Sequence, residues 1–367
     1  MSEKILIISR TITPNLAPRA HRATELAVEL SKQGCDVLLC AVLGKYDYTE
    51  FERTTNIKVF DLGISKFETI NSDVAGVKVA KWRKVVNRLL GRFFLFPDCL
   101  VGLRTRKFLK NHYDFDRIIT IAVPYPIHWG TGYAKRHYRH LKDAVWISDC
   151  GDPFMGNPFG RHPFYFKWIE KKWCSTTDYI SVPVQSAVDA YYLEYRNKIR
   201  VIPQGFCFDG LKLPEYKQNA IPTFAYSGAV YPNKRDPRPF LDFLVTLSEE
   251  FKFIVYSQSG SMFEPYQSLL GKKLEIRPYV PHDQLVYELG KMDFLINIQN
   301  ESMVQVPSKL IDYYMTKRPI LNINSSFDQM DSFKEFLQHN YKDQYVIENP
   351  NQYNISNVAK RFLSLNR

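Results

Sequence analysis

The sequence lacks the cysteine and histidine spacings that build metal sites and the long apolar runs that cross membranes. Its six cysteines include no CxxC pair, and its eight histidines show neither HxxxH nor HExxH spacing. We therefore expect no metal site, no disulfide framework and a reducing, cytoplasmic setting. No run of about 18 apolar residues occurs, so the sequence predicts no membrane-spanning helix. The apolar run Ile5–Ile8 is too short for a signal peptide and predicts a first β-strand.

Acidic residues are absent between Asp73 and Asp98, where the chain carries six Lys and Arg side chains. At about 100° per residue, this basic segment, residues 78–97, has cations on one helix face and apolar side chains on the other. Such a helix can lie on an anionic membrane; alternatively, its apolar face packs on the sheet of the N-terminal half. The cationic face comprises Lys81, Lys84, Arg88 and Arg92, and the apolar face comprises Trp82, Val86, Leu89, Leu90 and Phe93.

Acidic side chains are outnumbered by basic ones in only one half of the chain. Residues 1–205 hold 31 Lys and Arg against 20 Asp and Glu, whereas residues 206–367 hold 18 of each. The whole net charge of +11 therefore belongs to the first half. This asymmetry indicates an anionic partner for that half, such as a phospholipid surface, a lipid-linked phosphate or nucleic acid; a purely solubilising role is the alternative.

A chain of 367 residues is too long for one compact core and fits two domains. Short apolar runs alternate with amphipathic helical patterns throughout, which is typical of βαβ units and parallel sheets. We therefore expect an α/β fold of two Rossmann-like domains that face each other across a cleft. A linker rich in Gly, Pro and polar residues places these domains at residues 1–205 and 206–350. Residues 351–367 predict a helix, which could pack back on the N-terminal domain.

The apolar runs place the expected strands along both halves. A helix is predicted from Pro18 to just before Gly34, and another runs through Tyr191. The predicted strands are Ile5–Ile8, Val37–Val42, Arg117–Ala122, Ala144–Ser148, Tyr179–Val182, Ile199–Ile202, Thr223–Tyr226, Phe253–Tyr256, Leu274–Arg277, Asp293–Ile298 and Pro319–Leu321.

The stretch from Val306 to Leu321 predicts a loop, a helix that begins near Ser308, and a strand. The free amide groups and positive dipole end of a helix N-terminus bind phosphate, and Lys309 adds a full positive charge. Asp312, one turn further along, can accept hydrogen bonds from ribose hydroxyls, as carboxylates do in other Rossmann-type sites. The alternative is a capped surface helix with a solvated aspartate.

Two further segments of the C-terminal half suit a nucleotide. A strand is followed by the turn Ser227-Gly228 and then by the cations Lys234 and Arg235. Glycine lets the backbone approach a diphosphate, and cations can neutralise charge on a departing nucleotide. Residues 277–285 form a second turn; a plain strand-to-helix connection is the alternative for it.

In order and spacing, these segments resemble the donor domain of GT-B glycosyltransferases, especially the family-4-like enzymes of bacterial polysaccharide synthesis. Their pattern is an acidic residue one turn into a helix, followed seven residues later by proline, and Asp312 and Pro319 keep this spacing. The family usually has glutamate there and a second glutamate eight residues earlier. This chain has Val304 at the earlier position, and its nearest upstream acid is Glu301.

The resemblance implies roles for the residues that carry it. The backbone near Val280 would contact the nucleobase, and Asp312 would contact the ribose. Ser227 and Gly228 would hold the diphosphate together with the basic pair that follows them. The resemblance also implies retention of anomeric configuration, which the missing first glutamate leaves open.

The N-terminal half offers two more candidate sites. Asp149 and Asp152 follow a buried strand and enter a Gly/Pro turn, where a carboxylate can orient or deprotonate an acceptor hydroxyl. This turn resembles the Asp-x-x-Asp-Pro-aromatic turn of some family-4-like enzymes; a turn cap is the alternative. Arg19 and Arg22 could hold a phosphate of donor or acceptor, or form a solvated basic turn. The DxD at residues 114–116 precedes a strand and is therefore expected at the edge of the sheet away from ligands.

Together these patterns and the resemblance imply a metal-independent glycosyltransferase of the hexosyltransferase type. Its donor substrate would be a nucleoside-diphosphate sugar, with no other cofactor, and its acceptor a saccharide or lipid-linked saccharide in surface polysaccharide synthesis. We expect a cytoplasmic protein, peripheral at the inner face of the membrane through residues 78–97, and no nucleic-acid partner. The alternatives are a non-catalytic nucleotide-sugar-binding relative and a nucleotide-sugar epimerase on the same fold. The epimerase needs several acids and a histidine around the sugar, and the sequence shows no such cluster.

Overall fold

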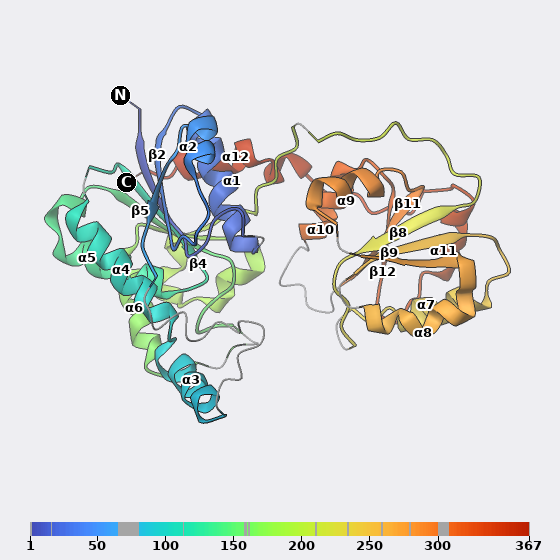
Figure 1. Ribbon diagram of the computed structural model, residues 1–367, viewed down its shortest axis with the longest axis horizontal. Coiled ribbons are helices and arrows are strands. Elements are labelled where there is room, and N and C mark those ends of the chain that lie inside the picture. Colours follow the sequence, from blue (N-terminus) through green and yellow to red (C-terminus); the bar gives the residue numbers. More distant parts are fainter. Residues whose placement is uncertain are drawn as a thin grey trace. The chain divides into compact units, whose positions relative to one another are not determined.

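The computed structural model divides into two compact units (Figure 1). Unit 1 comprises Met1–Cys207 and Gln352–Arg367, and unit 2 comprises Phe208–Asn351. Every described helix is too short or too polar to span a lipid bilayer. The structure describes residues 2–15, 17–64, 81–112, 114–157, 160, 162–209, 211–232, 235–257, 260–278, 280–299 and 308–366.

Unit 1 is built on a seven-stranded sheet with the strand order β3-β2-β1-β4-β5-β6-β7. All neighbouring strands are parallel. The central strands are near-continuous apolar runs because helices bury both of their faces. The strands are β1 Lys4–Ile8, β2 Asp36–Ala41, β3 Lys58–Asp61, β4 Arg117–Ala122, β5 Val145–Cys150, β6 Tyr179–Val182 and β7 Ile199–Val201.

Helices cover both faces of this sheet (Figure 1). Side chains alternate along β1, so that Leu6 and Ile8 join one core while Ile5 and Ile7 join the other. The first core is completed by α4, α5 and α6, and the second by α1 and α12. The helices of unit 1 are α1 Pro18–Lys32, α2 Thr49–Thr55, α3 Lys81–Phe94, α4 Asp98–Asn111, α5 Pro126–His137, α6 Phe166–Thr176 and α12 Ile355–Leu363.

Helix α12 belongs to unit 1 although it lies at the far end of the sequence. The side chain of Asn354 caps it by accepting a hydrogen bond from the Ser356 amide at 2.9 Å. At its other end, the buried Arg117 of β4 donates to the carbonyls of Phe362 and Leu365 at 2.8 and 2.6 Å. These bonds tie the C-terminal end of α12 and the residues that follow it to β4.

Unit 2 contains a five-stranded parallel sheet with the order β10-β9-β8-β11-β12. Phe224 lies at the centre of its core and stacks on Phe253 and Phe294, with ring centroids 4.9 and 4.8 Å away. The strands are β8 Thr223–Ser227, β9 Lys252–Tyr256, β10 Leu274–Arg277, β11 Phe294–Ile298 and β12 Ile320–Ile323. The helices are α7 Arg238–Thr246, α8 Glu264–Leu270, α9 His282–Leu289, α10 Ser308–Met315 and α11 Met330–Leu337.

Two elements differ from the sequence prediction. Strand β3 was not predicted, because a four-residue edge strand with only two apolar residues, Val59 and Phe60, gives little signal. The helix predicted through Tyr191 is instead two 3-10 helices, Gln185–Ala190 and Leu193–Lys198. Between them Tyr191 is extended, at φ −103° and ψ 158°, and its ring is buried in the core. Packing of this ring overrides the local helical preference.

Residues 81–94 of the basic segment form a helix, α3, whose apolar face does not pack on the sheet; residues 78–80 lie outside the described residues. Val86, Leu89 and Phe93 are 42%, 50% and 41% exposed. Figure 1 shows α3 at the margin of unit 1, beyond α6. The packing alternative for this helix is therefore wrong, and its apolar face lies on the surface.

The DxD at residues 114–116 lies where the sequence predicted. The Asp116 carboxylate accepts a hydrogen bond from the Lys4 amide at 2.8 Å, and the Lys4 ammonium pairs with Asp114. Both carboxylates therefore lie at the amino ends of β1 and β4, opposite the edge at which open α/β sheets bind ligands.

Candidate functional site

The segments predicted to bind a donor nucleotide converge in unit 2. Strand β8 ends at Ser227, α9 begins at His282 and α10 begins at Ser308. The chain continues from β8 to β9 on one side, whereas β11 lies on the other side. The carboxyl end of β8 is therefore a topological switch point, the place where open α/β sheets bind ligands.

The turn after β8 is fixed to α10 by a buried tyrosine. Tyr313 accepts a hydrogen bond from the Ser227 amide at 2.7 Å and donates to the Ser227 carbonyl at 3.3 Å. Gly228 follows at φ +131°, a conformation that glycine adopts without strain. A Cβ at Gly228 would lie 3.7 Å from Cδ of Lys309, so the lysine stem lies beside this glycine.

Lys309 is buried beside this turn without a counter-charge in the described structure. The residue is 8% exposed, and its Nζ has no hydrogen-bond partner among the described residues. The ammonium lies 4.3 Å from the ring centroid of Tyr226. Burial, and secondarily the charge of Arg235, hold the pKa of Lys309 well below its usual value. A buried cationic group with unsatisfied donors is costly to keep and suits an anionic ligand.

Arg235 reaches the same place from the loop after β8. Its backbone exchanges two hydrogen bonds with Tyr231, at 3.2 and 3.1 Å, which closes the loop. Burial raises the pKa of the Tyr226 hydroxyl to about 12, although the charge of Arg235 opposes this shift. Lys309 and Arg235 thus create positive potential at the carboxyl end of β8.

Asp312, predicted to contact ribose, pairs with a histidine that the sequence reading did not assign to the site. Nε2 of His282 lies 2.9 Å from Oδ1 of Asp312. The hydrogen bond to Asp312 raises the pKa of His282 to about 9. No sequence pattern marked His282, because its partner is 30 residues away along the chain.

Several predicted residues fall outside the described residues. These are Lys234 of the basic pair and positions 301 and 304 upstream of α10. Val280 lies between β10 and α9 and is half-buried. Within the described ranges, no group of three or more His, Cys, Asp or Glu side chains could hold a metal ion.

In unit 1, Asp149 lies at the end of β5 within a buried ion pair. Its carboxylate accepts hydrogen bonds from Arg22 at 2.9 and 3.2 Å and from Ser181 at 2.7 Å. Asp149 and Arg22 are each 2% exposed. Burial alone would raise the pKa of Asp149, but Arg22 and Arg19 outweigh it, and the pKa lies below its usual value. This inaccessible, neutralised carboxylate is poorly suited to the base role predicted from the sequence.

The two predicted phosphate-binding arginines have different environments. Arg22 is fully engaged, since its third contact is the Pro203 carbonyl at 2.7 Å; it is unavailable for the predicted phosphate contact. Arg19 is only partly buried and lies 3.4 Å from Asp149. Its guanidinium lies flat against Gly151, where a Cβ would approach Cζ to 2.5 Å. Gly151 therefore makes room for Arg19 beside the end of β5.

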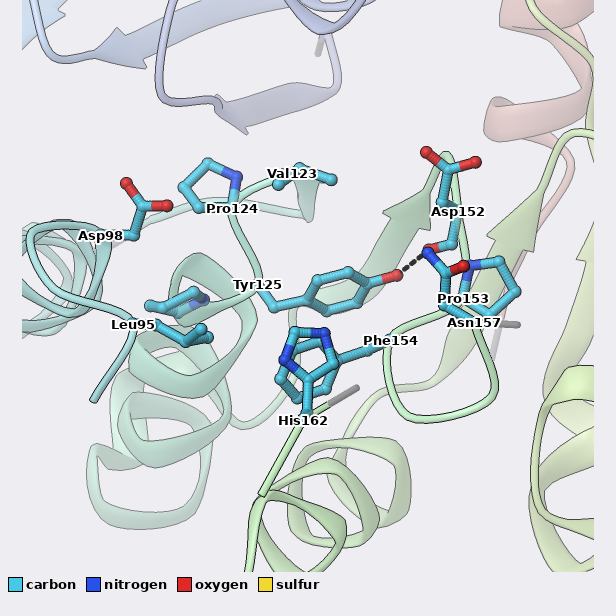
Figure 2. Close-up of a pocket in the computed structure, with 11 residues that line it drawn as sticks. Leu95, Asp98, Val123, Pro124, Tyr125, Asp152, Pro153, Phe154, Asn157 and His162 are labelled. Atoms are coloured by element: carbon cyan, nitrogen blue, oxygen red, sulfur yellow. Dashed lines mark hydrogen bonds between the residues drawn. The ribbon is translucent and has the colours of Figure 1, made fainter. Parts of the chain in front are cut away.

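Asp152 lines a pocket at the carboxyl ends of β4 and β5 (Figure 2), with a cavity volume of about 200 Å³. The Tyr125 hydroxyl donates to the Asp152 backbone carbonyl, and Figure 2 shows the Asp152 carboxylate pointing away from the aromatic rings. The ring of His162 lies 4.2 Å from that of Phe154, and burial lowers the pKa of His162. Aromatic rings with a few polar groups are typical of small-molecule sites.

Comparison with solved structures identifies the fold. No protein-family profile and no curated protein matches the sequence. The structure is similar to a glycosyltransferase from Rickettsia africae (TM-score 0.63, 13% identity) and to Anabaena HepE in complex with UDP-glucose (TM-score 0.56, 8% identity); each comparison covers 99% of this chain and 97% of the other. It is also similar to a UDP-GlcNAc 2-epimerase from Neisseria meningitidis (TM-score 0.57, 12% identity, 99% of both chains).

These similarities confirm the fold class expected from the sequence, which is the GT-B type with two Rossmann-like domains. At identities of 8–13% they establish the fold alone. Transferases and an epimerase share this architecture, so function must be argued from the site.

Proposed function

We propose that this protein is a glycosyltransferase whose unit 2 binds a nucleoside-diphosphate sugar. The observation that carries the proposal is the buried ammonium of Lys309, which has no hydrogen-bond partner in the described structure and lies beside Gly228 at the switch point. A diphosphate would supply the missing acceptor oxygens and counter-charge. Lys309 is the second residue of α10, and the free amide groups at the N-terminus of this helix would donate further hydrogen bonds to the diphosphate.

The remaining donor contacts follow from the same elements. Arg235 would share the diphosphate charge with Lys309, and the undescribed Lys234 keeps its predicted role. Ser227, Gly228 and Ser308 would approach the diphosphate through their backbones. Asp312 would accept hydrogen bonds from the ribose, and the backbone at Val280 would contact the base.

In the transfer step, the bond between the anomeric carbon and the diphosphate oxygen breaks and a bond to the acceptor hydroxyl oxygen forms. The electron pair of the broken bond leaves with the diphosphate, whose developing charge Lys309 and Arg235 stabilise. The proton of the acceptor hydroxyl must leave, either to a carboxylate or to the departing diphosphate. No metal is assigned a role.

The acceptor would bind in the pocket of unit 1. Of the two predicted carboxylates, Asp152 lines this pocket and remains our candidate for orienting or deprotonating the acceptor hydroxyl. Asp149 instead acts as a positioning residue, because it holds Arg22 and Arg19. The half-buried Arg19 is the one that we propose for a phosphate of the acceptor or donor.

Uracil is the base to test first, because HepE was solved with UDP-glucose and the epimerase with UDP-GlcNAc. We propose a family-4-like, retaining hexosyltransferase of surface polysaccharide synthesis on the spacing of Asp312 and Pro319. The missing glutamate at position 304 is the feature of the chain that speaks against the retaining assignment.

A lipid-linked acceptor and a peripheral membrane location are supported by α3. Trp82 and Phe94 are 64% and 62% exposed, and Arg88 and Arg92 of the same helix are also exposed. The Tyr165 hydroxyl donates to the Phe93 carbonyl, so α3 adjoins the start of α6. There Phe164 and Trp168 are exposed as well. Exposed aromatics among cations suit an anionic lipid surface.

A thermal-shift panel tests the donor site directly. UDP, GDP, ADP, CMP and dTDP are each added with and without EDTA, and the unfolding temperature is measured. We expect one diphosphate to raise it, unchanged by EDTA, because a ligand that binds only the folded state stabilises it. If none of the five raises the unfolding temperature, the proposed donor site is wrong.

An epimerase is the second candidate, because the Neisseria enzyme shares this fold. The two functions differ in their products. A transferase releases UDP from UDP-GlcNAc only as the sugar reaches an acceptor or water, whereas a 2-epimerase inverts the sugar at C2. Analysis of the sugar after incubation with UDP-GlcNAc separates them.

A further inference from the structure

We infer that His282 is a positioning residue that presents the Asp312 carboxylate to the ribose of a bound nucleotide. This inference rests on the proposed function, since it assumes that unit 2 binds a ribonucleotide. Its starting point is the hydrogen bond of 2.9 Å that joins the first residue of α9 to the middle of α10.

The hydrogen bond uses only one of the two oxygens of the carboxylate. Nε2 of His282 approaches Oδ1 of Asp312, which leaves Oδ2 to accept from ribose hydroxyls. Asp312 is mostly buried, with 17% of its side chain exposed. A buried carboxylate held at one oxygen loses little rotamer freedom on binding, which lowers the entropic cost of ligand contact.

The imidazole is held by a second carboxylate. Nδ1 of His282 lies 3.4 Å from Oδ1 of Asp283, a longer and exposed contact. Both ring nitrogens therefore face acceptors, an arrangement that favours the imidazolium form. The charged ring strengthens its hydrogen bond to Asp312.

The pair also connects two recognition elements. His282 comes two residues after Val280, which we propose contacts the base, whereas Asp312 comes three residues after Lys309, which we propose contacts the diphosphate. Helices α9 and α10 pack together in unit 2. This hydrogen bond links the segment that we propose contacts the base to the helix that we propose contacts the diphosphate, and the ribose joins these two parts of a nucleotide.

A purely structural link between α9 and α10 makes a different prediction. Loss of such a link would weaken every ligand of the site in parallel, because the whole site would loosen. Loss of a ribose-positioning residue weakens only ligands that contain ribose. Inorganic pyrophosphate contains the diphosphate without ribose or base and therefore separates the two roles.

The experiment is titration calorimetry of UDP and inorganic pyrophosphate into five proteins and one control variant. They are the wild type, His282→Ala, His282→Gln, Asp312→Ala and the double variant His282→Ala/Asp312→Ala. Gln284→Ala, an exposed neighbour on α9, is the matched control. His282→Gln keeps an N–H donor at this position and should retain most of the affinity for UDP. The unfolding curve of each variant shows whether the protein is folded.

Losing a residue that orients a ligating side chain typically costs about 10–100-fold in metal sites, and we expect about a 10-fold loss of UDP affinity in His282→Ala. Pyrophosphate affinity should stay within about twofold of wild type, within the scatter of a single conservative substitution. The double variant should bind UDP no more weakly than Asp312→Ala, because His282 acts through Asp312.

Three outcomes would overturn the inference: unchanged UDP affinity in His282→Ala, parallel losses for UDP and pyrophosphate, or additive losses in the double variant. The proposed function fails separately. If the wild type binds neither UDP nor pyrophosphate, the donor site itself is wrong and the inference falls with it. If the wild type binds pyrophosphate but not UDP, the diphosphate site stands while the ribose role of Asp312 and His282 does not.

Discussion

The ammonium of Lys309 lies 4.3 Å from the centre of the Tyr226 ring and makes no hydrogen bond to any described residue. The ring face attracts a cation, but it cannot replace three hydrogen bonds to oxygen. The unliganded protein therefore keeps an incompletely satisfied lysine at the place where a diphosphate would bind. Such an arrangement trades folding stability for ligand affinity.

Replacement of Lys309 by methionine should stabilise the unliganded protein. Methionine fills a similar volume without a buried donor group, and an unsatisfied buried polar group costs about 1–3 kcal/mol. We expect the free energy of unfolding in urea to rise by about that amount. Lys334→Met, at an exposed position of α11, should change it little. A destabilised Lys309→Met protein would mean that the ammonium has a partner that stabilises it.

The pKa of His282 predicts a pH-dependent contribution to stability. Its pKa is raised from 6.5 to about 9, first by the hydrogen bond to Asp312. A folded state with a raised pKa holds the proton more tightly, so the stabilisation is complete below pH 6.5 and is lost as pH rises through about 9.

The difference in free energy of unfolding between wild type and His282→Gln isolates this contribution. It should be largest at about pH 6 and should shrink toward about pH 10. Asp283→Asn should shift the transition only slightly, because Asp283 is the more distant partner. A difference that does not depend on pH would show that His282 does not carry the charge assigned to it.

The two carboxylates after β5 should separate stability from activity. Asp149→Asn leaves Arg22 buried without its counter-charge, and breaking a buried pair in this way costs about 3–5 kcal/mol. Asp152→Asn keeps the size of the side chain at a half-buried position, so it should cost less than Asp149→Asn. It should nevertheless lower transfer by about 100-fold or more, if Asp152 serves in acid–base catalysis. Measured unfolding and turnover of both variants check this assignment, and the reverse pattern would exchange the two roles.

Helix α3 should bind vesicles that contain anionic lipid. Burial of an aromatic side chain is worth about 1.5–3 kcal/mol, so Trp82→Ser and Phe94→Ser should each weaken binding to phosphatidylglycerol vesicles by about 10-fold or more. Val346→Ser, exposed on unit 2, is the control and should leave binding unchanged. Sedimentation with vesicles measures this, and equal binding to pure phosphatidylcholine would contradict an electrostatic contribution.

The sequence was most informative where apolar runs define buried strands. Runs such as Arg117–Ala122 are buried along their whole length, and the alternation of such runs with helical patterns predicted parallel sheets. An edge strand such as Lys58–Asp61 carries little apolar signal and was missed. The exposure of α3 could not be read from periodicity either, because an amphipathic helix has the same pattern on a sheet and on a membrane.

At the candidate sites, the structure differs from the sequence prediction because the interacting residues are far apart in the sequence. The sequence patterns placed Arg22 and Asp149 in separate candidate sites. In the fold they form one buried ion pair, although they are 127 residues apart along the chain. In the same way, Asp312 was expected to contact ribose and no protein partner was assigned to it, because its bond to His282 depends on how α9 packs beside α10. Local chemistry identified these residues as notable, but only tertiary structure assigned their partners.

Titration calorimetry of UDP into wild type and Lys309→Met, with and without EDTA, tests the central claim most directly. We expect the wild type to bind UDP equally well in both conditions. Lys309→Met should lose about 10-fold or more in affinity, since hydrogen bonds to charged groups are worth about 1.5–3 kcal/mol. Binding of UDP by Lys309→Met with the affinity of the wild type would contradict the claim that the buried ammonium holds the diphosphate.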